Sequence, residues 1–112
     1  MLTASIQEIK KELRTLDVSQ MQLLCMRLGK YKKENKELLN YLLFEAHNEP
    51  EYIQRVKEEM SELFKTLPIT NVYLIKKSLR KVLRFANRQI KYSSIKQTEL
   101  ELRIFFCTEM NE

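Results

Sequence analysis

Glycine occurs once in this chain of 112 residues, at Gly29, and proline occurs twice, at Pro50 and Pro68. All-β folds need many tight turns, and those turns depend on residues that accept a positive φ, glycine above all. The scarcity of glycine therefore favours helices joined by short links. Hydrophobic residues make up 44% of the chain and charged residues 31%, which is typical of a globular protein. We predict an all-α fold in a single domain of residues 1–112.

Residues that can cap helices divide the chain into about six helices. A capping side chain accepts a hydrogen bond from a free amide in the first turn of a helix. The predicted caps are Ser5 with Glu8, Asp17 with Gln20, Asn48 before Pro50, Thr70, and Ser94 with Gln97, and one more helix begins between residues 33 and 36. The helix that begins at Thr70 is expected to be the longest and to run to about Tyr92.

Two segments allow more than one interpretation. Gly29 is typical of the left-handed residue that follows a helix, although a helix that ran through it would join its neighbours into one. Residues 98–106, TELELRIFF, alternate apolar and polar side chains as a strand does. No other segment offers a strand to pair with, and an unpaired strand leaves its backbone groups unsatisfied. We therefore predict a helix for residues 98–106.

The links between the predicted helices are only a few residues long. Short links favour antiparallel neighbours, so we expect stacked αα-hairpins, one across residues 17–46 and one across residues 48–92. Such pairs can stack with the superhelical curvature of HEAT or armadillo proteins, although the sequence contains no repeat of fixed period. This analogy concerns the fold and carries no function with it.

The segment 76–92, KKSLRKVLRFANRQIKY, has Lys or Arg at seven of its seventeen positions and contains no acid. At 100° per residue the cations gather on one side of a helix, opposite apolar residues such as Leu79 and Ile90. At 1.5 Å per residue this side is roughly 20 Å long. We call it the basic stripe, and it consists of Lys77, Arg80, Lys81, Arg84, Arg88 and Lys91, with Tyr73 on the same side.

The basic stripe has two competing interpretations. In the first, glutamates of the flanking helices neutralise it; those available are Glu51, Glu58, Glu59, Glu62, Glu99 and Glu101. In the second, RNA, DNA or an acidic protein does so, with Tyr73 and Tyr92 as stacking groups and the basic run 27–36 as an extension. The sequence has no base-reading motif, so any contact with nucleic acid would be to the phosphate backbone.

Apolar side chains also lie outside the faces that are expected to be buried. They are Leu23, Met26, Tyr41, Phe44 and part of residues 104–106. One interpretation is that these helices lie in the middle of the fold, surrounded by other helices. The other is an exposed apolar patch that serves self-association or binds a partner helix.

Residue patterns that would indicate catalysis or metal binding are missing from the sequence. His47 is the only histidine, and neither a second imidazole nor a cysteine cluster accompanies it. Glu58 and Glu62 lie one turn apart on a face that we expect to be exposed, which is typical of surface charge. A single glycine cannot make a phosphate-binding loop or a nucleophile elbow. We expect no enzymatic activity, cofactor or metal.

Cys25 and Cys107 are far apart in the sequence and lie in apolar stretches, which favours buried, reduced thiols. Charged residues appear too early for the apolar core of a signal peptide. No apolar run approaches the roughly 20 residues of a membrane span. These features predict a cytoplasmic protein.

Residues 23–46, LLCMRLGKYKKENKELLNYLLFEA, and residues 72–107, VYLIKKSLRKVLRFANRQIKYSSIKQTELELRIFFC, resemble a family of small, uncharacterised, all-helical bacterial proteins. Together the two segments cover about half of the chain, and the resemblance brings no activity, cofactor or binding residue with it. From the residues themselves we expect a non-enzymatic interaction or scaffold domain whose partner is a protein, either itself or another. Binding of nucleic acid through the basic stripe is the alternative.

Overall fold

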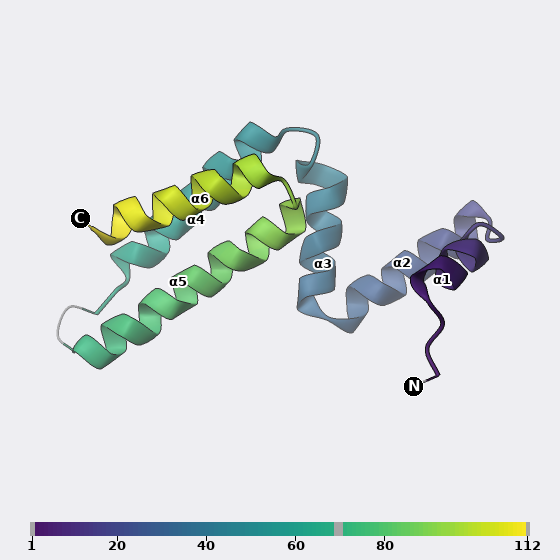
Figure 1. Cartoon of the computed structure of the whole chain (residues 1–112), viewed down its shortest axis with the longest axis horizontal. Coiled ribbons are helices and arrows are strands. Elements are labelled where there is room, and N and C mark those ends of the chain that lie inside the picture. Colours follow the sequence, from purple (N-terminus) through teal and green to yellow (C-terminus); the bar gives the residue numbers. More distant parts are fainter. Residues whose placement is uncertain (1, 69–70, 112) are drawn as a thin grey trace. The chain divides into compact units, whose positions relative to one another are not determined.

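The computed structural model describes residues 2–68 and 71–111, and the described residues form helices and connecting segments without a strand. The helices are α1 (Ile6–Leu13), α2 (Val18–Tyr31), α3 (Lys33–Asn40), the π-helical turn η1 (Tyr41–Glu45), α4 (Glu49–Lys65), α5 (Val72–Ser93) and α6 (Lys96–Met110) (Figure 1). The predicted all-α fold is confirmed, and so is the prediction of a helix at residues 98–106. A superhelical curvature stays a prediction.

The contacts between residues divide the chain into two compact units, residues 1–39 and residues 40–112. The first contains α1, α2 and nearly all of α3. The second contains η1 and helices α4 to α6. The prediction of a single domain is not tested by this division and stays a prediction.

Three predicted caps are found where the sequence places them. The Ser5 hydroxyl oxygen accepts from the Glu8 amide at 3.2 Å, and Asn48 accepts from the Glu51 amide at 3.3 Å. Asp17 and Gln20 form a complete capping box, in which each side chain accepts from the other residue's amide. These caps start α1, α4 and α2.

Two predicted helix boundaries differ from the structure. The helix α2 runs through Gly29 and ends at Tyr31, because Lys32 is extended, with φ −140° and ψ 148°. Gly29 does not form a left-handed turn; it lies close to Leu39, since a Cβ there would lie 2.7 Å from Cδ1, the flexible end of that side chain. The predicted capping box of Ser94 with Gln97 is also wrong, because Ser94 is the left-handed residue that ends α5, with φ 61°.

The start of α5 also differs from the predicted start. Asn71 caps this helix by accepting from the amides of Tyr73 at 2.8 Å and Leu74 at 3.3 Å. The predicted cap, Thr70, lies outside the described residues. With 22 residues α5 is the longest of the helices that the structure describes, as predicted.

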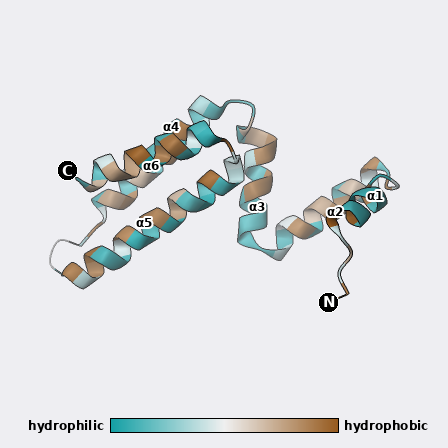
Figure 2. Ribbon diagram, viewed as in Figure 1, coloured by the Kyte–Doolittle hydropathy of each residue, from teal (hydrophilic) through white to brown (hydrophobic). Residues whose placement is uncertain are grey.

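The unit of residues 40–112 has a hydrophobic core among α4, α5 and α6 (Figure 1). The helix α5 runs antiparallel to α4, as predicted for this pair, and α6 returns alongside both. Hydrophobic and hydrophilic residues alternate along α5 in Figure 2, as expected of a helix with one buried side. The buried hydrophobic residues are Tyr41, Tyr52, Ile53, Val56, Met60, Val82, Ala86, Ile90 and Leu102.

The unit of residues 1–39 has no buried residue among those described. Ile9 and Leu13 of α1 and Leu16 of the following link line an open groove together with Leu24 of α2. Helices α2 and α3 are joined by the single residue Lys32, and the Asn35 side-chain amide donates to the main-chain oxygen of Leu28 at 2.8 Å.

Several apolar side chains lie differently from what their sequence context predicts. Leu23, Met26 and Phe44 are exposed, so the interpretation that other helices surround them is wrong; Tyr41, by contrast, is buried. Both cysteines are free and exposed, so the prediction of buried thiols is also wrong. The apolar residues around these positions suggested burial, but Leu23, Met26, Phe44 and the two cysteines lie on exposed sides of their helices.

Candidate functional site

The basic stripe lies on the side of α5 that faces away from the core. All of its cations are exposed except Arg88, which is half-buried, and Tyr73 is exposed as well. Val82, Ala86 and Ile90 occupy the opposite side of the helix and are buried. The predicted division of α5 into a cationic side and an apolar side is therefore present along the part of the helix from Val82 to Ile90.

The acidic residues of the neighbouring helices do not neutralise the basic stripe. The ion pairs found within the described part of the chain are Arg55–Glu45, Lys57–Glu101 at 3.8 Å, Lys65–Glu62 at 3.2 Å and Arg103–Glu99 at 2.9 Å. None of these pairs includes a residue of the stripe. Glu62, Glu99 and Glu101, three of the predicted counter-charges, pair with cations of α4 or α6 instead. Internal neutralisation is therefore not the explanation of the stripe in residues 2–68 and 71–111.

Repulsion along α5 is left uncompensated as a result. Arg84 has Arg80 one turn before it and Arg88 one turn after it, and like charges at this spacing destabilise a helix by about 0.2–0.5 kcal/mol per pair. Residues 65–98 contain nine Lys or Arg and no acid. A concentrated positive field of this kind attracts acidic ligands and is reduced by salt.

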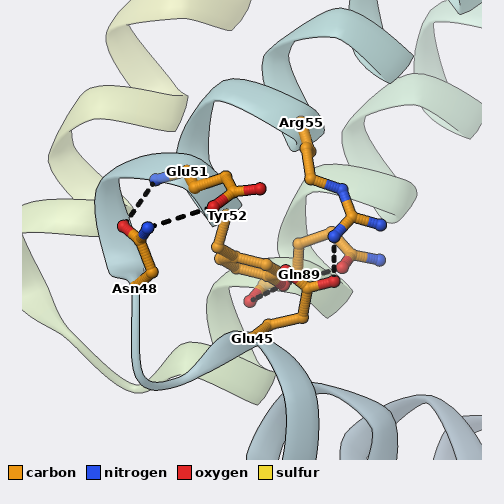
Figure 3. A network of polar contacts seen from close by, with 6 residues as sticks. All are labelled: Glu45, Asn48, Glu51, Tyr52, Arg55 and Gln89. Atoms are coloured by element: carbon orange, nitrogen blue, oxygen red, sulfur yellow. Dashed lines mark hydrogen bonds and ion pairs between the residues drawn. The ribbon is translucent and has the colours of Figure 1, made fainter.

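A polar network holds α5 in place against α4 (Figure 3). The Tyr52 hydroxyl of α4 donates toward the side-chain oxygen of Gln89 at 2.7 Å and lies 3.1 Å from the main-chain oxygen of the same residue. Burial, followed by the negative charge of Glu49, raises the pKa of Tyr52, so this hydroxyl stays a donor. Arg55 and the buried Glu45 pair beside it, which ties α4 to η1.

A second network surrounds the carboxylate of Glu49, which the sequence did not single out. Oε1 accepts from the Tyr41 hydroxyl at 2.6 Å, and Oε2 accepts from the hydroxyls of Ser93 and Thr98. Burial raises the pKa of Glu49, but the three donated hydrogen bonds outweigh it and leave the pKa below its ordinary value. The only indication of this network in the sequence was that Glu49 is an acid in the first turn of a helix. The residues that donate to Glu49 are 8, 44 and 49 positions away in the sequence.

The side chains considered as candidates for chemistry are all exposed. His47 is exposed in the turn between η1 and α4, and Glu58, Glu59 and Glu62 are exposed on α4. Among the described residues, no three His, Cys, Asp or Glu side chains are grouped so that they could hold a metal ion. The helices of the described part include none that is long and apolar enough to cross a lipid bilayer.

Comparisons of the chain with family models, with curated proteins and with solved structures found no match. The resemblance of residues 23–46 and 72–107 to small helical bacterial proteins therefore stays a prediction. Any proposal for function rests on the geometry of α5 and its neighbours.

Proposed function

We propose that the chain is a non-enzymatic helical interaction domain that binds an acidic partner protein through the basic stripe of α5. The observation that supports this most directly is the row of six cations without a described ion pair, although α4 and α6 carry acids of their own. A cationic row that tolerates its own repulsion is best explained by a ligand that brings the counter-charge. We place this activity in the cytoplasm.

The proposal gives Glu49 a structural role. Its carboxylate oxygens accept hydrogen bonds from the hydroxyls of Tyr41, Ser93 and Thr98, which lie on three other helical elements. The arrangement of Glu49 suits a carboxylate that connects helices.

The strength of stripe-mediated binding is limited by exposure. An exposed ion pair contributes about 0.2–1 kcal/mol, so six of them supply a few kcal/mol before the cost of association. Such contacts speed up encounter and orient the ligand more than they hold it. We therefore expect rapid, salt-sensitive binding.

Binding of nucleic acid is a second candidate function. It is favoured by the absence of acid from residues 65–98 and by the position of Tyr73, an exposed ring on the same side as the cations. The cations would contact phosphates and the ring would stack on a base. Recognition would be independent of base sequence.

Fluorescence anisotropy can test both candidates. The probes are an unstructured peptide of Glu and Ser and a mixed-sequence single-stranded oligonucleotide, each titrated with the full chain at two salt concentrations. If about six cations contact phosphates, log K for the oligonucleotide should fall against log salt with a slope near −4 to −5. Preference for the acidic peptide supports the first candidate, and preference for the oligonucleotide supports the second.

The variant that tests the stripe is Arg80→Glu with Arg84→Glu. Its matched control is Lys10→Glu with Lys96→Glu, which changes the net charge equally at exposed positions outside α5. The stripe variant should lose at least tenfold in affinity relative to the control. Equal losses in both variants, or no binding of either probe at low salt, would show that the stripe is not a binding site.

A further inference from the structure

An open apolar groove lies at the end of the second unit where α6 terminates, the end marked C in Figure 1. It has a volume of about 560 Å³ and takes residues from three helices. Its lining residues are Ser61, Phe64, Lys65, Leu67, Ile75, Leu79, Glu109 and Met110. A volume of this size is within the range of ligand-binding clefts.

The groove exists because the apolar side of α5 is longer than the part its neighbours cover. Val82 in the middle of the helix and Ile90 near its C-terminal end are buried, whereas Ile75 and Leu79 are only half-buried and Val72 is 70% exposed. The apolar side that the sequence predicts opposite the basic stripe is therefore only partly covered over the first turns of the helix, where α4 and α6 do not close over α5.

Positive charge flanks the groove on its α4 and α5 sides. Lys65 of α4 lines it, and at 100° per residue Lys76 of α5 lies between the groove-facing Leu79 and Arg80 of the basic stripe. Among the described residues Lys65 forms an ion pair with Glu62, and both side chains of that pair are more than 70% exposed, so the pairing leaves the ammonium open to a ligand. Glu109, on the α6 side, is the acid among the lining residues. On α5 the apolar residues that line the groove therefore lie next to the cations of the basic stripe.

We infer that the groove and the basic stripe together form one docking surface for an amphipathic helix of a partner protein. The apolar side chains of that helix enter the groove, and its acidic flank contacts Lys76 and Arg80. This inference rests on the proposed function and names the class of partner. The charge asymmetry sets the orientation of the helix, with its acids toward α5 and away from Glu109.

Burial of apolar side chains supplies the affinity that the stripe lacks. Exposed ion pairs orient a ligand but hold it weakly, whereas removal of apolar side chains from water favours the bound state more strongly. Helices that bind in grooves insert apolar residues spaced three and four apart. Nucleic acid offers no such apolar row, so the groove distinguishes the two candidate ligands.

The test uses the full chain and a synthetic amphipathic helical peptide with Leu at every third or fourth position and Glu along one flank. One control peptide keeps the Glu residues and replaces each Leu by Ser. The other keeps the Leu residues and replaces each Glu by Gln. Fluorescence anisotropy should show that the first peptide binds at least tenfold more tightly than either control.

The protein variant is Met110→Ser, which alters a groove-lining residue that is 49% exposed and leaves the core intact. Its matched control is Leu100→Ser, on the same helix, 55% exposed and outside the groove. Met110→Ser should weaken binding of the Leu/Glu peptide about fivefold to tenfold, and Leu100→Ser should leave it unchanged. Circular dichroism verifies that both variants fold.

The outcomes separate the inference from the proposed function. If the Leu-free peptide binds as well as the Leu/Glu peptide, and Met110→Ser has no effect, the groove is not a docking site. The stripe would then still bind acidic peptides. If only oligonucleotides bind, both the inference and the protein-partner function are wrong. If no probe binds at low salt, both are also wrong.

Discussion

The Tyr41 hydroxyl donates a hydrogen bond of 2.6 Å to Oε1 of Glu49, which connects η1 to the first turn of α4. The other carboxylate oxygen accepts from Ser93 at the end of α5 and from Thr98 in the first turn of α6. One side chain thus joins four helical elements on the side of the unit opposite the groove. The stability of the α4–α5–α6 unit should depend on it.

We predict that Glu49→Gln lowers the free energy of unfolding by about 2 kcal/mol, because an amide offers one acceptor oxygen where the carboxylate offers two. Thr98 is fully buried, so a lost acceptor cannot be replaced by water. Urea denaturation followed by circular dichroism measures the change. The control is Glu58→Gln, an exposed position on the same helix, which should cost less than about 0.5 kcal/mol. Equal costs would contradict the role given to Glu49.

The same carboxylate should make stability depend on acid pH. Burial acts to raise the pKa of Glu49, but hydrogen bonds from Ser93, Thr98 and Tyr41 hold it below the ordinary 4.5. The folded state therefore binds this proton less tightly than the unfolded state. The stabilisation is present above pH 4.5 and is lost as the pH falls through the folded pKa. Urea denaturation at a series of acid pH values should show a smaller loss for Glu49→Gln than for the natural chain; parallel losses would refute this.

We predict that Arg84→Glu stabilises the fold, by about 0.5–1 kcal/mol at low salt. The change converts two repulsive pairs, with Arg80 and Arg88, into attractive ones. Thermal unfolding at low and high salt measures the gain, which should shrink as salt screens the charges. Arg103→Glu provides the opposite case, because it removes the ion pair with Glu99 and should destabilise slightly. A destabilising Arg84→Glu would mean that the stripe has a counter-charge within the fold.

The replacement Gly29→Ala should stabilise α2 by about 0.5 kcal/mol. Alanine gains about 1 kcal/mol of helix propensity over glycine, and part of this is lost because Cδ1 of Leu39 must move away from the new Cβ. In a Leu39→Ala background the full gain should appear. Thermal melting of the helical circular dichroism signal gives both values. A loss of stability in both backgrounds would mean that Gly29 has a role other than close approach.

Local patterns in the sequence predicted much of the secondary structure. Ser5, Asp17 and Asn48 cap helices as predicted, because a cap depends on residues three positions apart. The predictions at Gly29 and Ser94 were wrong because the structure at these two residues depends on more than the residues next to them in the sequence. Gly29 lies inside α2 close to Leu39, and Ser94 ends α5 where a start of α6 was expected.

The candidate site was predictable only in part. Periodicity placed Lys77 and Arg84 on the solvent side of α5, because a helix repeats every 3.6 residues whatever surrounds it. The groove was not predictable, since it depends on how far α4 and α6 follow α5 and not on the apolar pattern at Ile75 or Leu79. The network of Glu49 was hidden for a similar reason, because it is formed by residues distant in the sequence.

The π-helical turn at residues 41–45 accommodates one more residue than an α-helical turn would, with the Ala46 amide bonded to the Tyr41 oxygen at 2.8 Å. Deleting a single residue such as Leu43 would let the segment revert to regular α-helix. The side chains before the deletion would then rotate by about 100° relative to α4. Tyr41 would swing away from Glu49, so a one-codon loss at an exposed position should disturb the unit more than many substitutions in its interior.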